Sequence, residues 1–203
     1  MTRTWIAIVL EAAFLLLAFG WRSWLQWRRT GSTGFLVPRR GAPFSELLAA
    51  GLFTASLALL VAAPIADLAG LDRIDLLDNG PVAVAGTLLA LLGIVLTVVA
   101  QLTMGESWRI GVDVQARTSL VTAGVFALVR NPIFSAMCLA SIGLALLVPN
   151  VVSVAALIVL VVGLELQVRL VEEPYLRSVH GPDYQRYLMT AGRFVPRVGL
   201  DRP

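Results

Sequence analysis

The sequence predicts an all-α, polytopic integral membrane protein with about five transmembrane helices, a tight C-terminal helical hairpin and a cytosolic amphipathic tail helix. Of its 203 residues, 58% are hydrophobic and only 14% are charged, and the mean hydropathy is +0.82. Soluble domains usually carry about 25% charged residues. The apolar residues are gathered in runs of about 20, long enough to cross a bilayer as helices. Lipid is therefore the natural solvent of this chain.

Five apolar runs predict the membrane helices in order. The first lies near the N-terminus, the second and third flank a loop rich in aspartate, and the last two are shorter. Only Pro149 and Asn150 separate the fourth run from the fifth, a turn signal that predicts an antiparallel hairpin. The predicted boundaries are Thr4–Trp21, Ser45–Ala66, Pro81–Met104, Pro132–Val148 and Val151–Arg169.

The placement of arginine predicts the orientation of these helices. All sixteen basic residues are arginine. With the N-terminus outside, five crossings put fourteen of them on the cytoplasmic side and two, Arg3 and Arg73, outside. This bias agrees with the positive-inside rule. We expect a multi-pass protein of a bacterial inner membrane, with Trp21, Trp24 and Trp27 in an interfacial aromatic belt.

Two polar stretches fall on that cytoplasmic side, residues 105–132 and residues 165 to the C-terminus. In the second stretch, Glu165, Arg169, Glu172 and Glu173 are spaced by three and four residues, so an α-helix would place them on one face. One guanidinium cannot neutralise three carboxylates near lipid, so this cluster predicts either an external cation or open water. Pro174 predicts a break in the helix directly after the pair.

The first stretch predicts a site for an anion. Asn131 is a good N-cap and Pro132 a good first helical residue, so the helix that follows presents a positive N-terminus. Thr122 and Gly124 allow the backbone to approach a ligand closely.

The tail predicts a turn followed by a short helix. His180 to Asp183 form the turn, and the helix carries Tyr184, Tyr187 and Leu188 on one face. This helix could lie on the membrane surface, form the roof of a site, or both. His180 is the only histidine and predicts no metal site. The arginines beside apolar runs are better explained by membrane topology than by nucleic-acid binding.

Motifs in the last hundred residues resemble the isoprenylcysteine carboxyl methyltransferase family, which is related to the membrane phospholipid methyltransferases. That family carries Arg-His-Pro-x-Tyr, Glu-Glu-x-x-Leu, Phe-Gly-x-x-Tyr-x-x-Tyr and a final arginine and proline. This chain has the corresponding segments in the same order, at residues 130–134, 172–176, 180–187 and 193–196. Residues 107–109 and 120–124 also resemble bacterial members. Asn131 replaces the family histidine and cannot titrate near neutral pH, which puts a proton-transfer role there in doubt.

The resemblance divides the chain into an N-terminal two-helix membrane segment, residues 1–80, and a methyltransferase-like core, residues 81–203. It implies that S-adenosylmethionine binds on the cytoplasmic side and that a lipophilic or small acceptor, a carboxylate, thiol or lipid, enters from the bilayer. A prenylated cysteine, a small thiol, a lipid or a quinone-like molecule all remain open. The predicted catalytic residues are Arg109, Glu173 and Arg193. The predicted cofactor-binding residues are Thr122, Gly124, Val125, Arg130, Asn131, Pro132, Glu172, Glu173, Tyr184 and Tyr187.

Two other functions remain open from the sequence. A membrane reductase with a nicotinamide cofactor would share a similar C-terminal helical layout, with the arginine-rich tail binding phosphates. A non-enzymatic membrane scaffold would use the same residues as interfacial salt bridges. Binding of S-adenosylmethionine or of a nicotinamide dinucleotide would separate the three.

Overall fold

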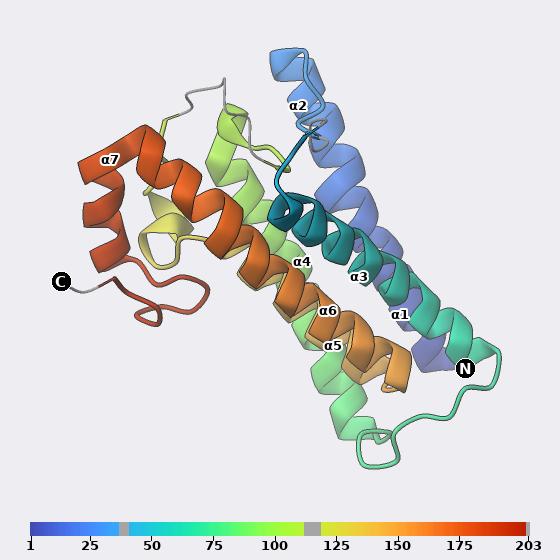
Figure 1. Ribbon diagram of the computed structural model, residues 1–203. Coiled ribbons are helices and arrows are strands. Elements are labelled where there is room, and N and C mark those ends of the chain that lie inside the picture. The colour runs from blue at the N-terminus through green and yellow to red at the C-terminus, as the bar shows by residue number, and fades with distance from the viewer. Residues whose placement is uncertain (37–40, 112–118, 202–203) are drawn as a thin grey trace.

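The computed structural model describes residues 1–36, 41–111 and 119–201 of the chain. Within these ranges the regular structure is helical (Figure 1). The elements in order are α1 (Thr2–Leu15), the π-helical η1 (Leu16–Trp21), α2 (Arg22–Thr30), α3 (Phe44–Leu68), α4 (Gly80–Met104), the 3₁₀ turns η2 (Gly105–Ser107) and η3 (Gly124–Ala127), α5 (Pro132–Leu147), α6 (Val151–Leu166), the π-helical η4 (Gln167–Glu172) and α7 (Glu173–Thr190).

The helix lengths confirm a polytopic membrane fold. Four of the described helices are long and apolar enough to cross a bilayer, and Pro132–Leu147 is a shorter apolar helix. The four long ones are Thr2–Thr30, Phe44–Leu68, Gly80–Ser107 and Val151–Thr190. The predicted runs coincide with these five helices.

The first helix is longer than the sequence predicted. It continues without a break through η1 and α2 to Thr30, so that Arg22 lies inside a helix and not in the first loop. Arg22 is buried, whereas Trp21, Trp24 and Trp27 are 37%, 49% and 55% exposed. The tryptophans therefore remain free to form the predicted belt, while the arginine between them packs inward.

Close helix crossings build the bundle. α4 packs along α5, and α3 packs along α6. At the α4–α5 crossing the backbones approach so closely that a Cβ atom on Gly93 would lie 2.3 Å from the Ala140 nitrogen, and one on Gly143 would lie 2.2 Å from the Ala90 nitrogen. Small residues at such contacts are typical of membrane helix pairs.

The hairpin between α5 and α6 turns at a fully buried Asn150. Its side-chain oxygen accepts from the Ser153 backbone nitrogen at 3.0 Å, and its side-chain nitrogen donates to the Ala63 carbonyl at 3.0 Å. The turn therefore caps α6 and also ties it to α3, as the sequence-predicted hairpin requires.

Replacing Asn150 by alanine should lower the free energy of unfolding by about 1–3 kcal/mol, because two buried backbone groups lose their partner. Thermal unfolding in detergent measures this loss. Asn79→Ala is the matched control, since Asn79 caps α4 at the exposed surface. Equal losses for the two variants would contradict the importance of burial at the hairpin tip.

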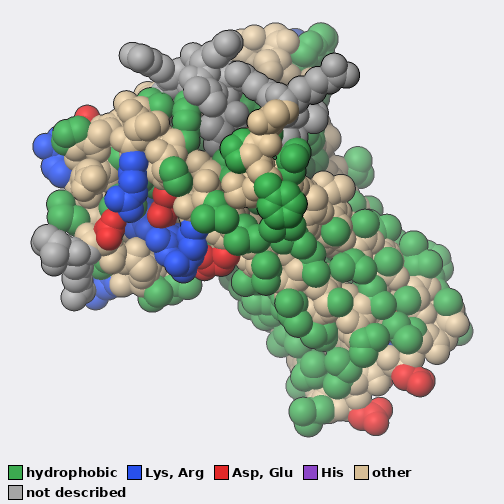
Figure 2. Space-filling model, in the orientation of Figure 1, with side chains coloured by type: hydrophobic (Ala, Val, Ile, Leu, Met, Phe, Trp, Pro, Cys, Tyr) green, Lys and Arg blue, Asp and Glu red, His purple; other side chains and the backbone are tan. Residues whose placement is uncertain are grey.

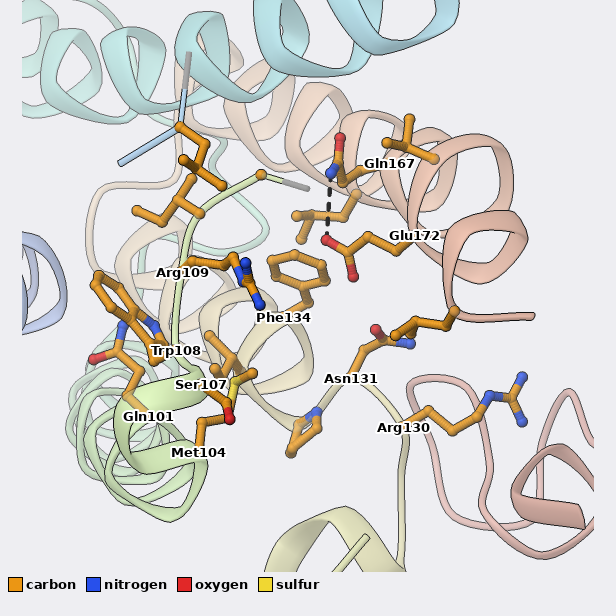
Figure 3. Close-up of a pocket in the computed structure, with 18 of the residues that line it drawn as sticks. Gln101, Met104, Ser107, Trp108, Arg109, Arg130, Asn131, Phe134, Gln167 and Glu172 are labelled. Carbon is orange, nitrogen blue, oxygen red and sulfur yellow. Dashed lines mark hydrogen bonds between the residues drawn. The ribbon is translucent and has the colours of Figure 1, made fainter. Parts of the chain in front are cut away.

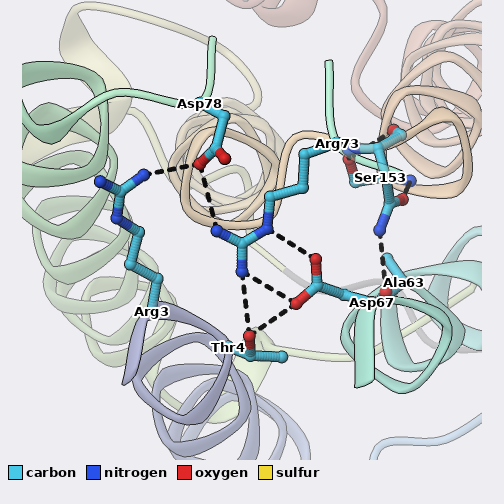
Figure 4. A network of polar contacts seen from close by, with 8 residues as sticks. Arg3, Thr4, Ala63, Asp67, Arg73, Asp78 and Ser153 are labelled. Atoms are coloured by element: carbon cyan, nitrogen blue, oxygen red, sulfur yellow. Dashed lines mark hydrogen bonds and ion pairs between the residues drawn. The ribbon is translucent and has the colours of Figure 1, made fainter. Parts of the chain in front are cut away.

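A polar network lies at the same end of the bundle as this hairpin tip (Figure 4). The guanidinium of Arg73 donates to both carboxylate oxygens of Asp67, at 2.6 and 2.9 Å, and to Asp78 at 3.1 Å. Arg3 also donates to Asp78, at 2.7 Å. These contacts place the only two arginines predicted outside the cell side by side.

The opposite end of the bundle holds both polar stretches. Arg22 donates to the Gly105 carbonyl at 2.5 Å, and Arg130 donates to the Ala191 carbonyl at 2.5 Å. Figure 2 shows hydrophobic side chains covering the long bundle, arginine side chains gathered mainly toward the α7 end, and acidic side chains at both ends. Arg39, Arg40, Arg117 and Arg202, which the orientation argument also used, lie outside the described residues.

The residues of the predicted acidic face have different partners. A π-helical turn holds more residues than an α-helical turn, so η4 changes the direction in which each following side chain points. Glu165 pairs with Arg169, while Glu172 and Glu173 make separate contacts. Pro174 does not break the helix, which continues from Val151 into α7; the proline lies just after the π-helical turn η4, where the regular α-helical hydrogen bonding is already interrupted.

The predicted turn in the tail is confirmed. Gly181 has φ 48° and ψ −121°, which interrupts α7 between two helical segments. The absence of a Cβ makes this backbone conformation accessible. The second segment therefore folds back, carrying Tyr184 and Tyr187 inward.

Candidate active site

A cavity of about 660 Å³ lies at the end of the bundle where the two polar stretches meet. Its walls come from α1, α3, α4, α5, α6, η4 and α7, together with the segment after η2. Apolar side chains such as Leu15, Phe19, Phe53, Leu57 and Met137 line it. Polar side chains line it as well, among them Arg109, Asn131, Gln167, Glu172 and His180. The cavity can therefore receive a polar group and an apolar chain together.

Two guanidiniums hold the carboxylate of Glu173. Arg130 donates to it at 3.0 Å, and Arg193 donates to its two oxygens at 2.8 and 3.1 Å. The hydrogen bonds to Glu173 raise the pKa of the Arg193 guanidinium, which keeps that side chain charged. Arg130 and Glu173 are 6% and 5% exposed, so this ion cluster is almost dry. We call Arg130, Glu173 and Arg193 the arginine clasp.

Backbone pairing holds the clasp together. The nitrogens of Arg130 and Asn131 donate to the carbonyls of Gly192 and Arg193, at 2.7 and 3.1 Å. Asn131 does not cap α5 with its side chain, contrary to the prediction, because its side-chain nitrogen donates to the Arg193 carbonyl at 3.1 Å. The chain before α5 and the tail after α7 are thus joined directly beneath the cavity.

Glu172 and Glu173 are adjacent in sequence but have different partners. Glu172 accepts from the side-chain nitrogen of Gln167 at 3.3 Å. In the described part of the chain, no arginine pairs with Glu172. Figure 3 shows Glu172 and Arg109 reaching from opposite walls toward the region around Phe134. The cavity therefore contains a carboxylate that a positively charged ligand could neutralise.

Tyrosines of the tail close another wall of the cavity. Tyr184 and Tyr187 are buried, and their ring centroids lie 6.2 Å apart in an edge-to-face arrangement. The Tyr187 hydroxyl donates to the Phe126 carbonyl at 2.6 Å, which ties α7 to η3. His180, to which the sequence gave no role, also lines the cavity.

The structure gathers most of the predicted site residues around this cavity. Those that line it are Arg109, Arg130, Asn131, Pro132, Glu172, Glu173, Tyr184 and Tyr187. Arg193 reaches the site through Glu173. Thr122, Gly124 and Val125 do not line the cavity; Gly124 has φ +60° and opens η3, whose Phe126 accepts from Tyr187.

Sequence reasoning missed several residues of the site. Gln101, Trp108, Phe134 and Gln167 line the cavity, as does a stripe on α3 that includes Glu46 and Phe53. Gln101 and Gln167 are polar residues inside apolar runs, which was the available signal for a site. The apolar residues of the α3 stripe carry no signal, because an apolar residue beside a cavity looks like one beside lipid.

A profile of the phospholipid methyltransferase family matches residues 82–183. This match spans half of the chain, from α4 into the second segment of α7, and includes Arg130, Glu172 and Glu173. The chain belongs to this family. Membership in this family identifies the chain as a membrane methyltransferase. The resemblance predicted from its motifs is confirmed. A search of curated proteins finds no significant match.

The fold of this family member is similar to a solved structure, that of the eukaryotic intramembrane Ras methyltransferase, isoprenylcysteine carboxyl methyltransferase, without a monobody. The TM-score is 0.60 and the sequence identity is 21%. The similarity covers 96% of this chain and 64% of the other, so the chain spans just under two thirds of that protein's length. The helical architecture therefore has independent support.

Proposed function

We propose that this chain uses S-adenosylmethionine to methylate a lipophilic or small acceptor, a carboxylate, thiol or lipid, at the cytosolic face of a membrane. The observation that carries the proposal is the cavity, which is lined by both charged and apolar side chains and lies at the arginine-rich end of the bundle. The excess of arginine at that end supports a cytosolic site.

The residues present fit this cofactor. The cavity volume falls within the range of about 300–1,000 Å³ that is typical of small-molecule sites. Glu172 offers a carboxylate without an arginine partner in the described ranges, which suits the ammonium group or the ribose hydroxyls. The aromatic walls, including Phe134 and Tyr184, suit an adenine ring. When bound, S-adenosylmethionine would supply a methyl group already activated by its sulfonium.

The task of the protein is then to align two reactants and exclude water. Glu172 would hold the cofactor by its positive groups, and Arg109 would hold an anionic group of the acceptor. The apolar side chains of the cavity would contact the acceptor's hydrocarbon. Good alignment alone can supply about 7–11 kcal/mol. A carboxylate or thiolate acceptor needs no base for this transfer.

We assign Glu173 and Arg193 to positioning, which revises their predicted direct roles. Three guanidinium nitrogens donate to the Glu173 carboxylate, so it is poorly placed to take a proton. Arg130, a predicted cofactor-binding residue, donates to Glu173 and to three backbone carbonyls. The clasp instead fixes the wall from which Glu172 projects.

Glu172→Gln tests the proposal. The loss of a charged hydrogen-bond partner should cost about 1.5–3 kcal/mol, or roughly 10–100-fold in affinity for S-adenosylhomocysteine. Calorimetry on the detergent-purified protein measures the affinity. Glu165→Gln is the matched control, because Glu165 pairs with Arg169 at an exposed site.

Three outcomes would contradict the proposal. The wild type could fail to bind S-adenosylhomocysteine and instead bind a nicotinamide dinucleotide, which would favour a reductase. It could bind neither while folded, which would favour a scaffold. Glu172→Gln could also bind as tightly as the wild type, which would remove Glu172 from the cofactor site.

A further inference from the structure

We infer that Arg22, a residue of the N-terminal helix outside the family match, is a positioning residue of the active site that acts through Trp108 on Arg109. The inference rests on the proposed function, since it assigns Arg109 to the binding of an anionic group in the cavity. Its geometric core, the contact of Arg22 with Trp108, is independent of that function.

Arg22 is a buried cation with unusual partners. It is 1% exposed, and its guanidinium lies 4.4 Å from the centroid of the Trp108 ring. It donates to the Gly105 carbonyl at 2.5 Å and to the Gln26 side chain at 3.0 Å, and its Nε atom is buried without a partner. Among the described residues, no carboxylate pairs with Arg22. A buried charge without an acidic partner costs free energy, so stability alone does not explain this arginine.

The contacts of Arg22 and Gln26 fix the segment after α4. Arg22 holds the carbonyl of Gly105, and the Gln26 side chain donates to the carbonyl of Glu106 at 2.7 Å. Side chains of the first helix therefore donate hydrogen bonds to two successive backbone carbonyls just before Trp108. These are the residues at which α4 ends and the cavity wall begins.

Trp108 also packs against Gly34, in the segment that follows α2. It is 2% exposed, and a Cβ atom on Gly34 would lie only 2.8 Å from its ring, so Gly34 leaves the space that the ring fills. Next to it, Ile110 donates to the Gly34 carbonyl at 2.8 Å and accepts from the Leu36 nitrogen at 3.0 Å. Residues 34–36 and 108–110 thus form a short paired unit.

Because Arg109 follows Trp108 in extended backbone, the contacts that hold Trp108 also hold the backbone of Arg109. Trp108 has φ −66° and ψ 131°, and in extended chain successive side chains point to opposite sides. Figure 3 shows Trp108 on one side of the segment and Arg109 on the other, reaching across the cavity toward Phe134. A fixed Trp108 therefore fixes the backbone position from which the Arg109 side chain enters the cavity.

The test uses Arg22→Met, which removes the charge while keeping an apolar stem of similar length, and Arg22→Lys, which keeps the charge. Arg28→Ala is the matched control, because Arg28 lies over the exposed Trp24 at 5.2 Å on the same helix. Dodecanoate serves as the anionic probe for Arg109, and S-adenosylhomocysteine as the cofactor probe. Calorimetry in detergent gives both affinities, and thermal unfolding gives the stability.

Arg22→Met should weaken dodecanoate binding about tenfold, as Arg109→Ala does, while the melting temperature stays within a few degrees of the wild type. Adding Arg22→Met to Arg109→Ala should weaken binding no further, because both changes act on one guanidinium. Arg22→Lys should recover part of the affinity, and Arg28→Ala should bind as the wild type does. Additive losses, or unchanged dodecanoate affinity in Arg22→Met, would overturn the inference.

Trp108 fluorescence supplies a readout that does not depend on the proposed function. Trp5, Trp21, Trp24 and Trp27 are exposed, so replacing them with phenylalanine leaves Trp108 as the only emitter. In that background Arg22→Met should shift the emission to the red and increase quenching by acrylamide. No change would overturn the inference even if both probes bind. A wild type that binds neither probe, with the shift still present, would sink the proposed function and leave the Arg22–Trp108 contact standing.

Discussion

Glu173→Gln is expected to destabilise the protein by about 3–5 kcal/mol, the cost of breaking a buried ion pair by removing one partner. The change keeps the shape of the side chain and removes its charge. Arg130 and Arg193 would then face each other without a carboxylate between them. Because the tail is joined to Asn131 through Arg193, we expect the C-terminal segment to detach before the bundle unfolds. Thermal unfolding and limited proteolysis of the detergent-purified protein measure the two effects.

Asp201→Asn is the control for this prediction. It removes the charge from an exposed pair with Arg177, which should cost at most about 1 kcal/mol. The double variant Glu173→Gln with Arg193→Met should be more stable than Glu173→Gln alone, because one unpaired cation is gone. Equal stability of Glu173→Gln and the wild type would show that the arginine clasp does not stabilise the fold.

Gly93→Ala is expected to cost about 3 kcal/mol, at the upper end of typical overpacking. The added methyl group would lie 2.3 Å from the Ala140 nitrogen, and neither backbone can move aside without separating α4 from α5. The same two helices carry Gln101, Asn131 and Phe134 into the cavity. We therefore expect the affinity for S-adenosylhomocysteine to fall together with the melting temperature. Calorimetry measures the affinity, and thermal unfolding measures the melting temperature.

Gly51→Ala is the matched control for Gly93→Ala. Gly51 also lies inside a membrane helix, but a Cβ atom there would meet nothing within 4 Å. Alanine should therefore raise the stability by about 0.5–1 kcal/mol, because glycine loses more freedom on folding. A Gly93→Ala protein as stable as the wild type would mean that the α4 and α5 backbones lie farther apart at this crossing than the 2.3 Å contact implies.

The helices were predicted well because lipid imposes a strict rule on them. A chain that crosses a hydrocarbon layer must satisfy its backbone within one helix, so an apolar run of sufficient length is a reliable signal. The predicted hairpin at Pro149 and Asn150 is confirmed for the same reason. The signal does not define where a helix stops outside the bilayer, and so the first helix continues past Trp21 to Thr30.

The site was predicted in part. Motif order brought Arg130, Glu172, Glu173 and Tyr184 into one pocket, and the structure places all four on its walls. The different partners of Glu172 and Glu173 could not be predicted, because the π-helical turn η4 changes the regular α-helical spacing between side chains. The contributions of Arg22 and the α3 stripe were also out of reach, since they come from the half of the chain that carries no motif.

The sequence by itself determined the solvent of this protein, the order of its apolar helices and the family to which it belongs, and it predicts their orientation. These properties follow from composition and from patterns between near neighbours in the chain. The tertiary structure decided that Glu173 pairs with two arginines, that Glu172 lines the cavity, and that Arg22 donates a hydrogen bond to the C-terminal end of α4. The contacts of Glu173 and Arg22 join residues 20 to 83 positions apart. Such contacts depend on how whole helices pack, which no local pattern specifies.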